Sequence, residues 1–216
     1  MTFVTGCGSD GADVLGAGSG SPSATGDAPK GSGGPHTSPA PKPPNGKPVE
    51  DSKAHISYVL PAGWTPTDDL LAYFTSGAQR GPGSSASPTG DTSSSGDGAD
   101  SGSFLVGLLD SGMFASQERD KQAAAHALAR QFAEFFYPNE AQDVTKDDKA
   151  VKVDGRDAWY TEVECVPASA DDKPFRLRVT VVDTGRTPVY TLGLANSGGS
   201  TPLAEIDGIN GSVRFT

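Results

Sequence analysis

Few side chains in this sequence combine a reactive type with a spacing that chemistry could use. The three histidines, His36, His55 and His126, stand too far apart to form the paired ligand motif of a zinc site. Neither a G-x-S-x-G nucleophile motif nor a complete phosphate-binding loop occurs. The run from Gly6 to Gly11 fits G-x-G-x-x-G, but no strand pattern precedes it and no helix pattern follows it. We therefore expect no catalytic residues, no metal and no cofactor.

Cys7 has the most specific context of any reactive residue. The run Val4-Thr5-Gly6-Cys7 places an aliphatic residue three positions before the cysteine and a small residue directly before it. It resembles the lipobox of bacterial lipoproteins, where a signal peptidase cuts before the cysteine and the thiol carries diacylglycerol. The resemblance implies lipid attachment at Cys7 and an extracytoplasmic location, anchored to the outer face of the cell membrane.

The residues before Cys7 do not complete such a signal. A secretory signal has a basic segment and an apolar stretch of roughly 7–15 residues before the cleavage site. Only Met1-Thr2-Phe3 precedes the lipobox. We expect residues 1–7 to be the remnant of a lipoprotein signal peptide and lipobox, with the start placed too far downstream. The alternative is a cytosolic protein in which V-T-G-C occurs by chance.

Composition divides the rest of the chain. Residues 8–53 hold 10 Gly, 8 Pro and 7 Ser among 46, with no Phe, Trp or Tyr. Residues 76–103 hold 7 Gly and 9 Ser among 28, with no large apolar side chain. Neither segment can bury enough apolar surface to offset the entropy of ordering its backbone. We therefore predict a disordered tether over 8–53 and a single domain over 54–216, with a low-complexity loop at 76–103.

The charge balance limits the partners of this domain. The chain has a formal net charge of −10, and from residue 54 onward it carries 22 Asp and Glu against 13 Lys and Arg. A surface of this sign repels nucleic-acid phosphates. We expect no binding to nucleic acid.

Periodicity predicts an α+β fold with a mainly antiparallel sheet, one long helix and one short C-terminal helix. The long helix covers residues 116–137, where Ser116 can cap the start and Pro138 ends the pattern. The dipeptide Asp154-Gly155 predicts a tight hairpin. Thr201 is expected to cap the short helix, with Pro202 in its first turn. The predicted strands are 56–60, 70–75, 104–109, 150–153, 156–166, 175–181 and 189–195, with an edge strand near 213–215.

One predicted strand carries the candidate ligand-binding residues. Trp159, Val163 and Cys165 alternate along it and share one face, which indicates a buried thiol at Cys165. Trp159 or Tyr160 is a candidate for lining a ligand groove. The alternative is that Trp159 fills the core.

Two short pieces connect the sequence to a known fold. Pro61-Ala62-Gly63-Trp64 follows the first strand, and Val153-Asp154-Gly155-Arg156-Asp157-Ala158-Trp159 forms the predicted hairpin. With the element order, these pieces resemble the Mog1/PsbP-like sandwich, and within it the LpqN-type lipoproteins of actinobacteria. The resemblance covers about 54–216. It implies a non-enzymatic cell-envelope domain that binds or scaffolds a protein, lipid or glycolipid partner.

Two other functions remain open from the sequence. One is a secreted or envelope hydrolase with an active site dispersed over loops, and the other is a structural spacer. An apolar cavity between the long helix and the sheet would favour ligand binding, whereas a polar cleft with a perturbed carboxylate pair would favour an enzyme.

Overall fold

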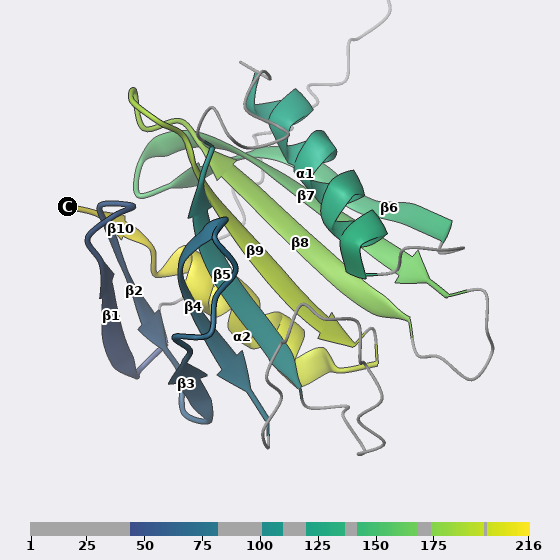
Figure 1. Ribbon diagram of the computed structural model, residues 1–216, viewed down its shortest axis with the longest axis horizontal. Helices are drawn as coiled ribbons and strands as arrows, with labels where there is room; N and C mark the ends of the chain where they lie inside the picture. Colours follow the sequence, from purple (N-terminus) through teal and green to yellow (C-terminus); the bar gives the residue numbers. More distant parts are fainter. Residues whose placement is uncertain (1–43, 82–100, 110–119, 137–141, 168–173, 197) are drawn as a thin grey trace, which may run out of the picture. The chain divides into compact units, whose positions relative to one another are not determined.

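The computed structural model describes residues 44–81, 101–109, 120–136, 142–167, 174–196 and 198–216. Its largest element is a seven-stranded antiparallel sheet in the order β3-β4-β5-β9-β8-β7-β6 (Figure 1). Its strands are β3 (Trp64–Pro66), β4 (Phe74–Arg80), β5 (Gly102–Leu108), β6 (Gln142–Val153), β7 (Arg156–Val166), β8 (Phe175–Val182) and β9 (Val189–Asn196). A second antiparallel sheet has the order β1-β2-β10 and comprises β1 (Lys47–Asp51), β2 (Ile56–Leu60) and β10 (Arg214–Phe215).

The two helices cover opposite faces of the large sheet (Figure 1). Helix α1 (Lys121–Phe136) packs on β7 and β8, and helix α2 (Ser200–Gly211) packs on β5 and β9. Alternate strand residues therefore enter two separate cores. Leu177 and Val179 belong to the core under α1, whereas Phe104 and Val106 belong to the core shared with α2 and the small sheet. The predicted α+β sandwich is confirmed.

Helix α1 confirms the predicted long helix over residues 121–136. Its apolar face consists of buried alanines with Leu128 and Phe132. The Asp120 carboxylate caps the start, because its Oδ1 accepts hydrogen bonds from the backbone N–H of Gln122 (2.8 Å) and of Ala123 (3.1 Å). Ser116, the predicted cap, lies outside the described residues.

The predicted tether boundary at residue 53 is wrong, because β1 lies before it and pairs with β2. Asp51 ends β1 and is buried, and its Oδ1 accepts hydrogen bonds from the backbone N–H of Lys53 and Ala54. The strand is held by backbone pairing and by this carboxylate rather than by apolar side chains. A search for alternating apolar residues therefore misses it. The remainder of the predicted tether, residues 8–43, lies outside the described residues.

The predicted loop at 76–103 is too long at both ends, since β4 runs to Arg80 and β5 begins at Gly102. The small residues of β4 are needed for packing. A Cβ added at Gly77 would lie 2.7 Å from Leu105 Cδ2 and 2.9 Å from Leu70 Cδ2. The small residues that indicated disorder at this end of the segment are therefore required by close packing within the sheet. Residues 82–100 of the loop lie outside the described residues.

Three further boundaries differ from the sequence prediction. The strand predicted at 70–75 begins only at Phe74, and the strand predicted at 150–153 extends back to Gln142 as β6. Helix α2 begins one residue before Thr201, so its N-cap is Gly199, which makes no side-chain cap hydrogen bond. The hairpin at Asp154-Gly155 is confirmed: Val153 pairs with Arg156, and φ is +50° and +77° at the two turn residues.

Close packing between β5 and β9 makes a testable prediction at Gly107. A Cβ there would lie 2.3 Å from the Tyr190 hydroxyl oxygen and 2.5 Å from the backbone oxygen of Tyr73. We expect Gly107→Ala to lower the free energy of unfolding by about 1–3 kcal/mol, because the backbone oxygen cannot move aside cheaply. Urea unfolding measures the loss. Gly198→Ala is the matched control, since a Cβ there has no neighbour within 4 Å. Equal unfolding midpoints for the two variants would refute the packing argument.

Candidate functional site

A recess lies where several turns meet at one end of the two sheets. The β1–β2, β6–β7 and β8–β9 turns reach this end together with strand β10. Alternate turns of an antiparallel meander fall at the same end of a sheet, which brings the β6–β7 and β8–β9 turns together. The recess has a volume of about 470 Å³, and we call it the loop-end groove. It is lined by Lys53, Ala54, His55, Leu108, Arg156, Thr184, Arg186, Thr187, Phe215 and Thr216.

The charge of the loop-end groove is opposite to that of the whole chain. Its lining includes Lys53, Arg156 and Arg186 and contains no Asp or Glu, although the chain has a net charge of −10. Neither Lys53 nor Arg186 forms an ion pair within the part of the chain that the structure describes. Two cationic side chains are thus available to a ligand.

Arg156 is held in place by two contacts. Its Nη1 donates a hydrogen bond to the backbone oxygen of Thr184 (3.1 Å), and its guanidinium carbon lies 4.5 Å from the centroid of the Phe215 ring. The first contact links the β6–β7 and β8–β9 turns, and the second is a cation–π interaction with the small sheet. Arg156 therefore joins three segments of the groove wall and keeps further N–H donors for a ligand.

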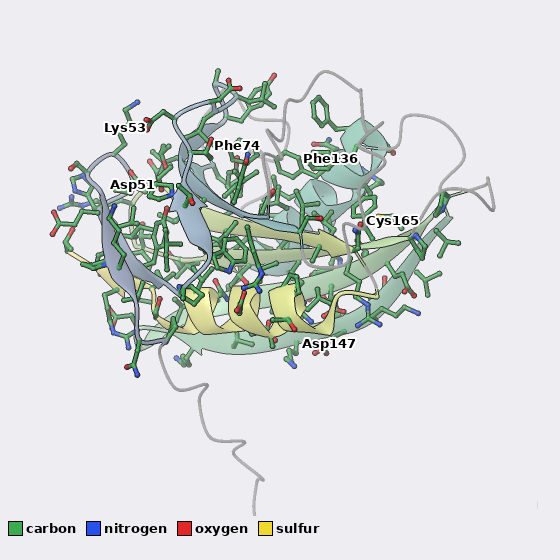
Figure 2. All side chains as sticks on the ribbon, turned by 90° about the horizontal axis from the view of Figure 1, so that it is seen from below. Asp51, Lys53, Phe74, Phe136, Asp147 and Cys165 are labelled. Carbon is green, nitrogen blue, oxygen red and sulfur yellow. The ribbon has the colours of Figure 1, made fainter. Side chains whose placement is uncertain are left out.

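The carboxylates near the loop-end groove hold its turns. Asp154 Oδ2 accepts a hydrogen bond from the backbone N–H of Phe215 (3.0 Å), and Asp183 Oδ1 accepts one from Gly185 (2.9 Å). Asp51 holds the β1–β2 turn, and His55 in that turn has a φ of +53°. Figure 2 shows Asp51 and Lys53 at one end of the domain, with Cys165 toward the other. The acidic groups fix the backbone, and the basic groups line the recess.

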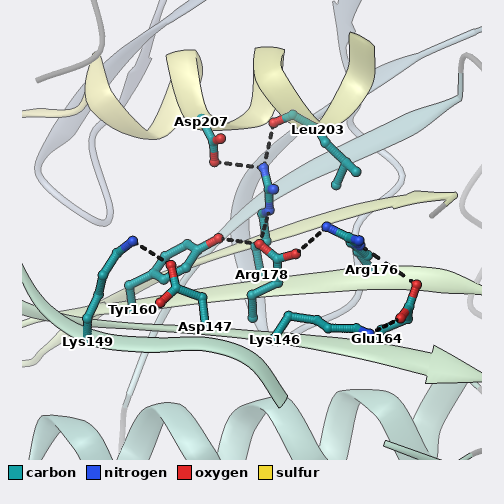
Figure 3. Close-up of polar contacts among 10 residues, drawn as sticks. Lys146, Asp147, Lys149, Tyr160, Glu164, Arg176, Arg178, Leu203 and Asp207 are labelled. Carbon is teal, nitrogen blue, oxygen red and sulfur yellow. Dashed lines mark hydrogen bonds and ion pairs between the residues drawn. The ribbon is translucent and has the colours of Figure 1, made fainter. Parts of the chain in front are cut away.

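A second polar cluster lies between α2 and the large sheet (Figure 3). Glu162 is 5% exposed, and its carboxylate accepts hydrogen bonds from Arg176 Nη1 (2.9 Å), Arg178 Nε (2.9 Å) and the Tyr160 hydroxyl (2.8 Å). Arg178 Nη1 continues to the Asp207 carboxylate (2.7 Å) and to the backbone oxygen of Leu203 (2.6 Å). Because buried charges must be paired, this cluster fastens α2 to β7 and β8.

The α2 cluster does not provide a catalytic carboxylate pair. Burial raises the pKa of Asp207 despite Arg178 beside it, and burial also raises the pKa of the Tyr160 hydroxyl. However, Arg178 bonds to both Glu162 and Asp207, and the recess beside them has a volume of about 10 Å³. This volume holds one water molecule at most. The cluster is a structural link.

Trp159 belongs to a third cluster, on the α1 side of the sheet. The Asp148 carboxylate accepts hydrogen bonds from Trp159 Nε1 (2.7 Å) and the Thr161 hydroxyl (2.8 Å), and His126 Nε2 lies 2.9 Å from the same oxygen. Partial burial acts to raise the pKa of the Asp148 carboxyl, but the hydrogen bonds lower the pKa by more. The pKa of Asp148 therefore lies below its ordinary value of 3.8. Asp148 therefore connects α1, β6 and β7.

The structure does not bring Trp159 and Tyr160 together. As neighbours in β7 they lie on opposite faces, Trp159 against the core under α1 and Tyr160 beside α2. The two side chains therefore face different surroundings, and neither lines the loop-end groove. A ligand groove lined by Trp159 or by Tyr160 stays a prediction. Cys165 is buried as predicted. Cys7 lies outside the described residues, and its lipid attachment stays a prediction.

Sequence reasoning missed the residues of the loop-end groove, although a partial signal was present. Arg156 follows the Asp154-Gly155 turn between β6 and β7, and Arg186 lies in the turn between β8 and β9. Because alternate turns of an antiparallel meander fall at the same end of the sheet, both arginines are expected at one end. Nothing in the sequence places Lys53 or Phe215 beside them. Among the described residues there is no cluster of metal-ligating side chains and no helix long and apolar enough to span a bilayer.

The described fold defines the chain as a Mog1/PsbP-like α+β sandwich. Cyanobacterial PsbP (CyanoP) from Synechocystis sp. PCC 6803 is similar, with a TM-score of 0.53, 13% identity, and coverage of 88% of this chain and 100% of CyanoP. The Ran-binding protein Mog1p of Saccharomyces cerevisiae has a TM-score of 0.56, 11% identity, and coverage of 79% of this chain and 95% of Mog1p. LpqN of Mycobacterium tuberculosis, involved in cell envelope biogenesis, has a TM-score of 0.47 and 16% identity over 84% of this chain and 87% of LpqN.

The chain belongs to the fibronectin-attachment protein (FAP) domain family, whose sequence profile matches residues 48–189. The match begins inside β1, in agreement with a domain that starts before residue 54. No curated protein sequence matches the chain. The predicted Mog1/PsbP-like fold is confirmed, and the closer identity with LpqN-type lipoproteins stays a prediction.

The hydrogen bonds on Asp148 predict a pH-dependent contribution to stability. We expect Asp148→Asn to lower the free energy of unfolding by about 1–2 kcal/mol at pH 7, because a neutral amide accepts hydrogen bonds more weakly. The folded-state pKa lies below 3.8, so this stabilisation is present above pH 3.8 and is lost as the pH falls through the folded-state pKa. Urea unfolding from pH 7 downward should show the wild type and the variant converging.

Asp147→Asn is the control for Asp148→Asn. Asp147 pairs with Lys149 on the surface, and its side chain is 41% exposed, so its removal should cost less than about 0.5 kcal/mol. Equal losses for the two variants, or a difference that does not change with pH, would contradict the assignment.

Proposed function

We propose that this chain is an envelope lipoprotein whose domain binds an extracellular protein of the fibronectin type without catalysis. The observation that carries the proposal is the loop-end groove, which is open, has a volume of about 470 Å³ and presents cationic side chains that the fold does not use. Pockets of several hundred cubic ångströms with a few polar groups are typical of binding sites.

The polar clusters of the domain support binding rather than reaction. The carboxylates of Glu162 and Asp148 each lie within hydrogen-bond distance of three neighbouring side chains. A general base needs a lone pair aimed at a substrate and space for that substrate. The core under α1 is occupied by apolar side chains from the helix and the sheet. Both clusters therefore act as links between elements, and the hydrolase alternative has no support from them.

The comparisons support a protein partner. The family is described by attachment to fibronectin, and its profile spans most of the described domain. Mog1p, which shares the fold, is described as a Ran-binding protein. Fold likeness at 11% identity does not transfer a partner. The family membership is what makes an extracellular matrix protein the first partner to test.

The lipid anchor at Cys7 places this domain outside the cell in our proposal. Residues 8–43 would then join the membrane to the domain, with a span of at most roughly 130 Å if fully extended. A spacer of this length would allow the groove to meet a large partner away from the bilayer.

Metabolic labelling tests the anchor. We expect a fatty-acid probe to label the chain when a functional lipoprotein signal peptide replaces residues 1–3, with the run Val4–Cys7 retained. Cys7→Ala should abolish the label, because the thiol is the acylated group. Cys165 provides an internal control, since it is buried in the folded domain. Equal labelling of the wild type and Cys7→Ala would end the lipoprotein proposal.

Binding to immobilised fibronectin tests the partner. The full chain with Cys7→Ala, which cannot be acylated at that position, is passed over fibronectin and over serum albumin in a biosensor. We expect saturable binding to fibronectin at least about tenfold tighter than to albumin, a difference of about 1.4 kcal/mol. Indistinguishable responses on the two surfaces would contradict the proposed partner.

A further inference from the structure

We infer that the loop-end groove binds a short acidic segment of a protein partner, with carboxylates on Arg156 and Arg186 and apolar side chains on Phe215. This inference rests on the proposed binding function and names the chemistry that the groove recognises. The observation behind it is that cationic residues from three different turns line one recess together with Phe215, whose ring contacts the Arg156 guanidinium.

The local charge favours an anionic ligand. Lys53, Arg156 and Arg186 give the lining a formal charge of +3, and a terminal carboxylate at Thr216 would leave +2. The nearby carboxylates of Asp51, Asp154 and Asp183 accept hydrogen bonds from the backbone of the turns. These three carboxylates keep their negative charge, and Asp154 also lies 3.7 Å from Arg214 Nε, so the excess of positive charge is confined to the lining itself.

The donor geometry suits carboxylates. The Arg156 guanidinium lies over Phe215 and donates one hydrogen bond to Thr184, which limits its motion and leaves its other N–H groups available. A guanidinium donates parallel hydrogen bonds to the two oxygens of a carboxylate. Arg186 follows Gly185 in the facing turn, and its backbone N–H is bound to the Thr184 hydroxyl (3.2 Å). Arg156 and Arg186 thus line the same recess.

The apolar part of the lining favours a peptide over a bare inorganic anion. Phe215, Leu108 and Ala54 form part of the wall beside the cations. A segment that alternates acidic and aliphatic residues would satisfy both kinds of surface. A hydrated phosphate ion would leave the apolar wall uncovered.

The net charge argues against an extended polyanion as the ligand. The chain carries −10 even with the groove cations included, so an anionic bilayer would meet repulsion around the groove. Exposed charges interact over about 8 Å at physiological ionic strength. A segment short enough to lie within the groove is attracted by the nearby cations and largely screened from the acidic surface beyond.

Fluorescence anisotropy with a defined peptide tests the inference. The probe is a labelled hexapeptide that alternates leucine and aspartate, and the protein is the full chain with Cys7→Ala. We expect saturable binding that weakens as salt is added, and at least about tenfold weaker binding when asparagine replaces aspartate. Arg186→Gln should weaken binding about fivefold, and Arg186→Glu more than about tenfold.

Arg130 provides the matched control, because it is an exposed arginine on α1, away from the groove lining. Arg130→Gln and Arg130→Glu change the net charge by the same amounts and should alter binding less than about twofold. All four variants should keep the unfolding midpoint, since Arg186 and Arg130 form no ion pair among the described residues. Equal effects at Arg186 and Arg130 would overturn the inference.

Two competitors separate the ligand classes. If inorganic phosphate at 1 mM displaces the peptide, or if vesicles with 30% phosphatidylserine bind and Arg186→Glu abolishes that binding, the acidic-segment inference falls. Fibronectin binding that is unchanged in Arg186→Glu would leave the proposed function intact and overturn the groove chemistry. Peptide binding without fibronectin binding would support the groove chemistry and overturn the proposed partner.

Discussion

Coverage of both faces of the seven-stranded sheet is the constraint on which the other features of the domain depend. Helix α1 seals one face, and α2 with the small sheet seals the other, so alternating side chains on both sides of β8 and β5 are buried. A polar residue that points from the sheet must then be paired, as Glu162 is with Arg176 and Arg178. The strand ends are not covered by either helix, and the loop-end groove lies at one such end.

The distribution of charge follows from the same constraint. Several carboxylates connect elements within the domain. Asp120 caps α1, and Asp148 connects α1 to the sheet. Glu162 and Asp207 bind Arg178 and so connect α2 to the sheet. At the loop end, Asp154 and Asp183 accept hydrogen bonds from backbone N–H groups, and Asp154 also lies 3.7 Å from Arg214 Nε. Arg156 and Arg186 form no ion pair among the described residues, so their charge is available to the groove although the chain as a whole is acidic.

Elements whose buried apolar residues repeat with a clear period were predicted from the sequence. Elements held mainly by backbone hydrogen bonds were missed. Ile56–Leu60, α1 and the strands from Arg156 onward follow from alternating or helical apolar patterns. β1 carries only one partly buried apolar residue, Val49, and β4 contains Gly77, where a Cβ would overlap the side chains of Leu105 and Leu70. For the site, meander topology could have paired Arg156 with Arg186. Lys53 and Phe215 come from a separate small sheet, whose position no local pattern encodes.

Placing the groove on turns separates binding from stability. Gly155 and Gly185 have φ values of +77° and +73°, and a Cβ at either would have no neighbour within 4 Å, so the turns project away from the packed sheet. Residues in such turns can be exchanged without creating a cavity or an overlap in either core. Arg186 lies in one of these turns, and Arg156 joins the other to Phe215 through its ring contact. A change of ligand in related domains would therefore require new turn side chains, whereas Glu162, Asp148 and the buried strand residues must stay to keep the sheet covered.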